Sequence, residues 1–171
     1  RESRIPFVVY DGMCEMDDEE IAMLTVDNRK GGLLAGEYLY DMGHRSVLCI
    51  TDNHWRMDED RCNGVIEKVG KGEELMIPID KDERWKLYKE KMDYILSFSS
   101  VFAISDFYAL DFMAFMEAEG KRIPQDISLI GFDGSLSAQQ FNLTTITQDH
   151  IQRAYYAVES LEEFRRNEMK N

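Results

Sequence analysis

Short runs of apolar residues recur along this chain of 171 residues, and their spacing limits most strongly the folds that it can adopt. The runs are FVVY, VLCI, MIPI, VFAI and SLIGF, which span residues 7–10, 47–50, 76–79, 101–104 and 128–132. Continuous apolar runs of four or five residues are typical of strands that are covered on both faces. They therefore predict five strands, and TTIT at 144–147 predicts a short sixth.

Segments with helical spacing lie between these strands. Residues 106–119 place Ala109, Leu110, Met113 and Met116 on one face, and Gly120 follows where a helix would end. Further helices are expected at about 29–41, 58–69, 83–97 and 150–166, with Asp27 or Asn28 as the N-cap of the first and Gly43 at its end. Strands that alternate with helices predict an α/β fold, a three-layer α/β/α arrangement of the Rossmann or flavodoxin type around a mostly parallel sheet.

Two local features refine this prediction. Pro78 lies inside MIPI and cannot donate to a ladder, so we expect this strand at an edge of the sheet. The charged stretch DKDERWKLYKEK at 80–91 is expected to be a solvated helix face.

The charge balance excludes several kinds of partner. The chain carries 33 acidic and 20 basic side chains, a net charge of −13. A surface this acidic repels phosphate, so we expect neither nucleic acid nor an anionic membrane to bind this stretch. No apolar run is long enough to span a bilayer. Cys14, Cys49 and Cys62 lack the spacing of a metal or redox motif, which favours reduced thiols in a cytoplasmic protein.

Polar residues follow the predicted strands, where open parallel sheets bind their ligands. They are Asp11, Thr51, Asp52, Asp80, Ser105, Asp106 and Asp133. Such residues also cap helices, and we favour the N-cap interpretation for Asp106, which would directly precede a helix that begins at residue 107. Asp133 is followed by Gly134 and by a segment without a clear amphipathic helix. Its carboxylate is therefore expected to accept hydrogen bonds from a ligand.

Arg61 is a second candidate, near the start of the helix that follows strand 47–50. Its planar donors suit a carboxylate or two adjacent hydroxyls. Together with the strand-tip carboxylates, it favours a polyhydroxylated ligand such as a sugar. Trp55 and Trp85 could stack on a sugar or could equally pack within the protein.

Enzyme signatures are absent from the sequence. It has no P-loop, no G-x-G-x-x-G after a strand and no G-x-S-x-G elbow, and His44, His54 and His150 are scattered. We therefore expect no catalytic residue, no cofactor and no enzyme activity. The cluster TDNHWRMDED at 51–60 could in principle bind a metal, but one histidine among acidic residues on a loop is usually solvated, so no metal site is expected.

Four blocks of sequence, in a fixed order, carry a family resemblance. They are VDNRKGGLLAGEYLYDMGHRSVLCITD at 26–52, RCNG at 61–64, VFAISDFYALDFMAFMEAEGKRIPQDISLIGFDGS at 101–135 and LTTITQD at 143–149. The ordered set resembles the LacI/GalR transcriptional regulators. The resemblance implies a periplasmic-binding-protein-like (type I) effector domain with two α/β subdomains, joined by crossover segments, and a ligand in the cleft between them.

The resemblance also implies residue roles. Positions that commonly line the family's effector site are occupied by Asp11, Arg61, Ser105, Asp133 and Gln148. Only the resemblance points to Gln148, whereas the other four also follow from the predicted strand tips and helix start. Gly134 and Val65 depart from the family pattern, which leaves the identity of the effector open.

The resemblance divides the chain into three parts. Residues 1–24 would hold the last strand of an N-terminal subdomain and a crossover, 25–148 the C-terminal effector-binding subdomain, and 149–171 a returning helix. A helix-turn-helix that reads the operator would precede Arg1, so DNA would be bound through that domain and not through this stretch.

The implied protein is a cytoplasmic, homodimeric repressor under allosteric control by a sugar. A stand-alone periplasmic sugar-binding protein of a transport system is the alternative, and a flavodoxin-like enzyme is a more distant one.

Overall fold

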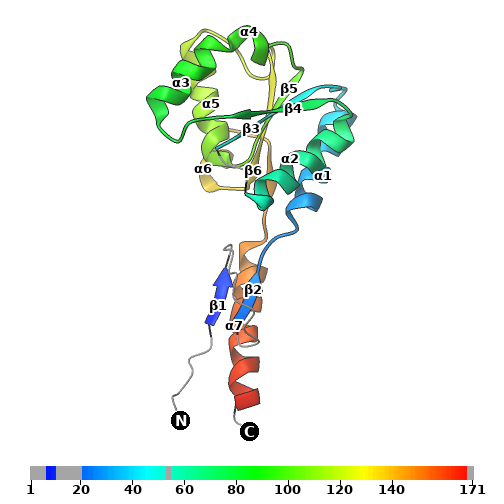
Figure 1. Cartoon of the computed structure of the whole chain (residues 1–171), viewed down its shortest axis with the longest axis vertical. Coiled ribbons are helices and arrows are strands. Elements are labelled where there is room, and N and C mark those ends of the chain that lie inside the picture. The colour runs from blue at the N-terminus through cyan, green and yellow to red at the C-terminus, as the bar shows by residue number, and fades with distance from the viewer. Residues whose placement is uncertain (1–6, 11–20, 53–54, 169–171) are drawn as a thin grey trace. The chain divides into compact units, whose positions relative to one another are not determined.

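The computed structural model describes residues 7–10, 21–52 and 55–168 (Figure 1). The chain divides into two compact units, one formed by residues 1–26 and 148–171 and the other by residues 27–147. Within the first unit, β1 (Phe7–Tyr10) pairs in parallel with β2 (Ile21–Leu24), and both strands contact α7 (His150–Glu168). None of the described helices is long and apolar enough to cross a membrane.

The second unit is built on a five-stranded sheet with the order β4-β3-β5-β6-β7. Its strands are β3 (Val47–Thr51), β4 (Gly72–Met76), β5 (Ser100–Ala103), β6 (Ser128–Asp133) and β7 (Thr145–Thr147). Every neighbouring pair is parallel, which confirms the predicted sheet. All five carboxyl ends therefore meet at one edge.

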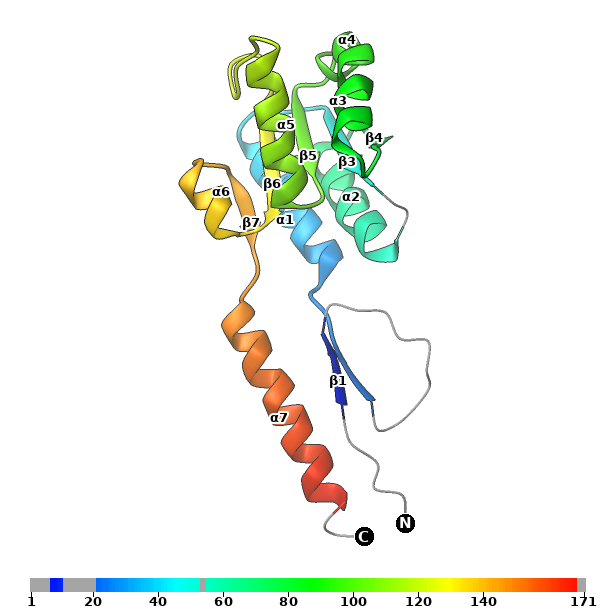
Figure 2. The ribbon, with the colours of Figure 1, turned by 90° about the vertical axis from the view of Figure 1, so that its left-hand side faces the viewer.

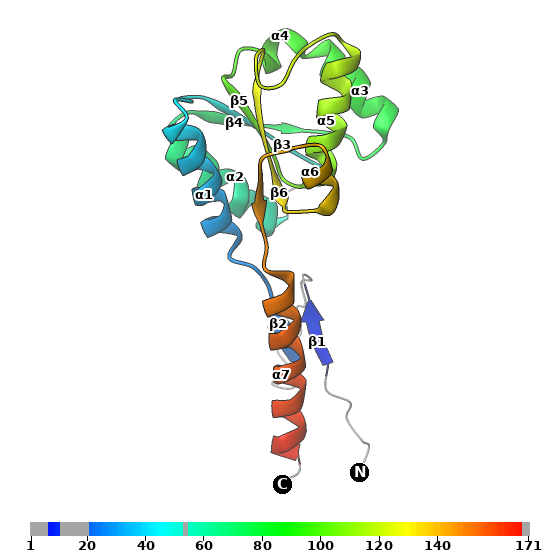
Figure 3. The ribbon, with the colours of Figure 1, turned by 180° about the vertical axis from the view of Figure 1, so that it is seen from behind.

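Helices cover both faces of this sheet. One face carries α1 (Asn28–Asp41) and α2 (Arg56–Val69), and the other carries α3 (Lys81–Glu90), α4 (Met92–Ile95) and α5 (Asp106–Ala118), as Figures 2 and 3 show. Right-handed crossovers require this arrangement, because the chain steps from β3 to β4 in one direction and from β5 to β6 in the other. The short helix α6 (Leu136–Gln140) packs beside α5.

The core lies on both sides of the central strands. Every residue of β3 and of β5 is buried, which is why these strands read as continuous apolar runs. Between α3 and α5, aromatic rings meet edge to face, with Tyr88 against Phe112 and Trp85 against Phe115. This packing joins the two helices firmly.

Two predicted elements need correction, and one strand was missed. The strand expected at 76–79 is β4 at 72–76, so Pro78 lies beyond it, although the edge position is confirmed. An edge strand buries few side chains, and the exposed Glu73 and Glu74 of β4 concealed it from a search for apolar runs. The helix expected at 83–97 is two helices, α3 and α4. Strand β2 was not predicted.

Glycines bring α1 and α2 into backbone contact. A Cβ on Gly32 would lie 2.2 Å from the carbonyl oxygen of Arg61, and one on Gly64 would lie 2.6 Å from that of Arg29. Only glycine permits so close an approach. The packing of these two helices therefore fixes the backbone of Arg61.

Candidate functional site

The carboxyl edge of the sheet in the second unit collects polar side chains from three neighbouring strands. Asp52 follows β3, Ser105 follows β5 by two residues, and Asp133 is the last residue of β6. All three are partly buried. Because the strands are parallel and adjacent, the structure brings these predicted residues to one place.

The guanidinium of Arg61 joins the ends of β5 and β6. Its Nε donates to Oδ1 of Asn28 at 2.8 Å, and NH1 donates to the carbonyl of Ile104 at 2.7 Å. Its carbon lies 4.0 Å from the centre of the Phe132 ring, a cation–π contact. Since Ile104 precedes Ser105 and Phe132 precedes Asp133, Arg61 is held against the neighbours of both predicted site residues.

Asn28 is a residue whose role the sequence did not reveal. Of the two N-cap candidates, Asp27 is correct, because its carboxylate accepts the amide of Lys30 at 2.9 Å. Asn28 is almost fully buried and instead orients Arg61. The sequence contained one hint of this role. Asp27 already caps the helix, so the polar side chain of Asn28, directly after it, is not needed as a cap.

Asp133 has an unusual backbone. Its φ is +124°, a value that residues with a side chain rarely adopt. Gly134 follows with a φ of +72°, and a Cβ there would meet Thr147 at 2.8 Å. Strained backbone of this kind concentrates at functional sites. The strain is a second, independent reason to single out Asp133.

Ser105, not Asp106, is the N-cap of α5, so our capping interpretation of Asp106 was wrong. The Ser105 hydroxyl accepts the amide of Tyr108 at 3.4 Å. Asp106 is already helical and buried, and its carboxylate accepts the Ser135 amide at 2.7 Å and the Thr145 hydroxyl at 2.5 Å. Both residues are good N-caps, and the helix begins one position earlier than we expected.

The segment after Asp133 differs from the prediction in one respect. A short helix, α6, does form there, and Ser135 is its N-cap through a 3.1 Å bond from the Ala138 amide. Asp133 is therefore not a helix cap, which agrees with the role predicted for it.

The carboxylate of Asp52 is held by a hydrogen bond from a residue of α5. The hydroxyl of Tyr108, in the first turn of α5, donates to Oδ2 of Asp52 at 2.7 Å. Burial, and next the hydrogen bond to Asp52, raise the pKa of the Tyr108 hydroxyl well above its usual value. The hydroxyl therefore remains a proton donor at neutral pH.

The two tryptophans differ in their surroundings. Trp85 packs within the protein, because its Nε1 donates to Asp111 at 3.1 Å and its ring contacts Phe115. Trp55 directly precedes α2 and is 59% exposed. Asp80, another strand-tip candidate, caps α3 by accepting the amides of Asp82 and Glu83, each at 3.0 Å.

The remaining candidates lie outside the described part of the second unit. Asp11 lies outside the described residues, as do Asn53 and His54 of the acidic cluster at 51–60. Gln148 belongs to the other unit, where its Oε1 accepts a hydrogen bond from Arg153 at 2.5 Å. Within the described part of the chain, no three His, Cys, Asp or Glu side chains gather as they would around a metal ion.

Comparison with known proteins defines the class. The model of the periplasmic binding protein-like domain matches residues 37–169. The chain therefore belongs to the periplasmic binding protein-like domain family, as the three-layer fold and the polar carboxyl edge indicate.

Its relatives are transcriptional regulators and not enzymes. The chain is 26% identical over 162 residues to the HTH-type transcriptional regulator CelR of Thermobifida fusca, covering 86% of this chain and 46% of CelR. It is 30% identical to the HTH-type transcriptional repressor PurR of Vibrio parahaemolyticus, covering 86% and 47%. The chain spans about half the length of these relatives. These matches confirm the resemblance to the LacI/GalR regulators.

Solved structures share the fold. A periplasmic binding protein/LacI transcriptional regulator from Alkaliphilus metalliredigens, complexed with D-xylulofuranose, superposes with a TM-score of 0.77 at 26% identity, covering 92% of this chain and 61% of that one. A LacI family regulator from Enterococcus faecium with bound ribose gives a TM-score of 0.76 at 24% identity, with the same coverage. The second similarity shows the fold alone.

Proposed function

We propose that this chain is the effector-binding region of a cytoplasmic LacI-type regulator and that a small sugar binds at the carboxyl edge of β3, β5 and β6. The observation that carries the proposal is the position of Arg61, held against the ends of β5 and β6 beside Ser105 and Asp133. The D-xylulofuranose bound to the structural neighbour from Alkaliphilus metalliredigens supports the ligand class.

The site residues have complementary roles. Asp133 accepts hydrogen bonds from sugar hydroxyls, and Arg61 donates to a sugar oxygen. Ser105 uses a lone pair to cap α5, and its hydroxyl can still donate its proton to a sugar oxygen. Asp11 and Gln148 remain candidates that rest on the family resemblance, as do the assignment of 25–148 to one subdomain and the helix-turn-helix before Arg1.

Binding alone does not regulate. The sugar changes operator affinity only if it prefers one of two conformations of the whole protein, and the size of the change is set by that difference in affinity. DNA is bound through a separate domain, because the acidic surface of this region repels phosphate.

Calorimetric titration of the full-length protein with D-ribose and D-xylulose tests the site. Asp133→Asn keeps a residue type that tolerates positive φ but removes the charge, so the affinity should fall about tenfold or more, as expected for a lost charged hydrogen bond. Asp126→Asn is the matched control, because Asp126 precedes β6 at its other end and accepts the Arg122 amide.

Two results would count against this proposal. If Asp133→Asn bound the sugars as tightly as the wild type, Asp133 would not be part of the binding site. If the wild-type protein bound neither these two sugars nor any other sugar of a broad panel, the proposal that its ligand is a sugar would be wrong.

We also propose that the intact protein is a homodimer through the outer face of α5. A cavity of about 390 Å³ lies there, with Leu110, Met113, Ala114 and Phe141 among its lining residues. Its lining also includes Glu117, Lys121 and Arg122, so this face offers charges of both signs to a second copy related by a two-fold axis.

Sedimentation of the full-length protein tests the dimer. Phe141 is 62% exposed, and Phe141→Asp should give a monomer because it places a charge in the apolar contact. Met42→Asp, at an equally exposed methionine after α1, should remain dimeric. A dimeric Phe141→Asp variant, or a monomeric wild type, would rule out this interface.

A further inference from the structure

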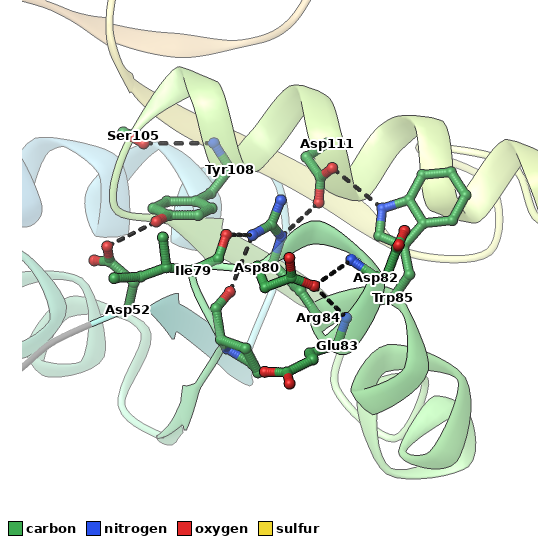
Figure 4. A network of polar contacts seen from close by, with 11 residues as sticks. Asp52, Ile79, Asp80, Asp82, Glu83, Arg84, Trp85, Ser105, Tyr108 and Asp111 are labelled. Atoms are coloured by element: carbon green, nitrogen blue, oxygen red, sulfur yellow. Dashed lines mark hydrogen bonds and ion pairs between the residues drawn. The ribbon is translucent and has the colours of Figure 1, made fainter.

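Arg84 is a buried arginine in α3, a helix whose other charged side chains are exposed. Its side chain is 1% exposed, which the prediction of a solvated face for 80–91 did not anticipate. Its Nε donates to Oδ2 of Asp111 on α5 at 2.7 Å, and the indole of Trp85 donates to Oδ1 of Asp111 at 3.1 Å (Figure 4). Both oxygens of the Asp111 carboxylate are thus engaged.

The second contact of Arg84 is with the loop that follows β4. NH1 donates to the carbonyls of Pro78 at 3.0 Å and Ile79 at 2.8 Å, as Figure 4 shows for Ile79. This loop lies at the carboxyl edge of the sheet, where the Ile77 amide also bonds the Thr51 carbonyl at 2.8 Å. The backbone of Ile79 is therefore held by Arg84, whereas the residue itself is 76% exposed.

The same guanidinium lies beside Tyr108, with its carbon 5.2 Å from the ring centre. Tyr108 in turn fixes Asp52, the residue after β3. Asp111 and Tyr108 are both on α5. Asp52 and the loop that follows β4 are therefore attached to one helix through this group, which we call the Arg84 network (Arg84, Asp111, Trp85 and Tyr108).

Stability alone does not explain the choice of residues. Desolvation of a buried ion pair offsets much of its attraction, and a well-packed apolar pair is often equally stable. An apolar pair at positions 84 and 111 could not donate to the two loop carbonyls. The feature that needs arginine is this donation at the carboxyl edge.

We propose that Arg84 and Asp111 are positioning residues that hold the loop after β4, and Asp52 through Tyr108, in their binding geometry before a ligand arrives. The network thereby lowers the ordering cost of binding. The consequence for ligand affinity rests on the proposed function, whereas the ordering of the loop does not.

Hydrogen exchange of the ligand-free, full-length protein tests the ordering. In the double variant Arg84→Met/Asp111→Leu, the amides of Ile77, Asp82 and Glu83 should exchange about tenfold faster. The amide of Ile104, which bonds Ile50 in the sheet, should be unchanged. Unchanged exchange at all four amides, or equal acceleration at all four, would overturn the proposal, since the second result indicates a general loss of stability.

A matched control uses another ion pair between the same two helices. Lys89 and Glu119 meet at 2.8 Å near the C-terminal ends of α3 and α5, and Lys89→Met/Glu119→Leu should leave all four amides unchanged. If the buried double variant does not fold, Arg84→Lys replaces it. Lysine retains the charge but not the planar fork, so the same three amides should still exchange faster. Full protection in Arg84→Lys would contradict the role of the fork.

Affinity separates this proposal from the proposed function. With D-ribose and D-xylulose, the buried double variant should bind about tenfold more weakly than both the wild type and the Lys89→Met/Glu119→Leu control. Equal affinity would show that the loop does not serve the ligand. If the wild type binds neither sugar, the sugar assignment fails, and hydrogen exchange alone decides whether Arg84 orders the loop.

Discussion

Replacement of Gly32 by alanine tests how the packing of α1 on α2 supports the site. The added Cβ would lie 2.2 Å from the Arg61 carbonyl oxygen, 2.9 Å from its carbon and 3.0 Å from its Cα. Ordinary contact begins at 3.4 Å, and all three atoms are backbone, so no side-chain rotation relieves the clash. The two helices must therefore separate by about 1 Å, and Arg61 moves with α2.

The expected loss follows from two opposing effects. Overpacking of a well-packed contact costs about 1–3 kcal/mol, and a clash with rigid backbone belongs at or above the upper end. Alanine recovers about 1 kcal/mol through its higher helix propensity. The free energy of unfolding should therefore fall by about 2 kcal/mol, which for a protein of this size lowers Tm by about 4–8 °C.

Urea denaturation measures this change, and sugar titration measures its effect on the site. Lys30→Ala, at an exposed position of the same helix, is the control and should change the stability by no more than about 0.5 kcal/mol. In Gly32→Ala the affinity should also fall, because the displaced Arg61 loses its alignment with Asn28 and Ile104. A Gly32→Ala variant as stable as the wild type would refute the close packing of the two helices.

Two further predictions concern single groups. The buried Tyr88 hydroxyl has no hydrogen-bond partner among the described residues. Tyr88→Phe removes it and should therefore raise the free energy of unfolding, measured by urea denaturation, by about 1 kcal/mol. A clear loss of stability would indicate that the hydroxyl is hydrogen-bonded. Burial, followed by the charge of Arg45, lowers the pKa of His44 from its usual 6.5. Its protonation therefore favours the unfolded chain, and the stability present above pH 6.5 is lost as the pH falls toward the lowered pKa. Between pH 7.5 and 5.5 the wild type should lose more stability than His44→Gln, and equal losses would contradict this.

The central strands and the polar residues at their carboxyl ends could be predicted because their signals are local. β3, β5 and β6 are covered on both faces, so each is a continuous apolar run, and a parallel sheet then places the residues after them at one edge. Ser105 and Asp133 follow from that placement, and Arg61 follows from its place near the start of α2.

The features that were missed depend on contacts between distant residues. Arg84 lies in a charged stretch and is buried only because Asp111, 27 positions later, supplies its counter-ion. Asn28 looks like a capping residue until Arg61 is placed beside it. The positive φ of Asp133 occurs directly before Gly134, whose backbone lies close to Thr147, and residue types alone do not reveal it.

A crystal structure of the full-length protein with its sugar bound tests the central claim most directly. The account predicts sugar oxygens at hydrogen-bond distance, about 3 Å, from the Arg61 guanidinium and the Asp133 carboxylate, at the carboxyl edge of β5 and β6. A sugar bound in the cavity beside Phe141, with Arg61 and Asp133 making no contact with it, would contradict the account.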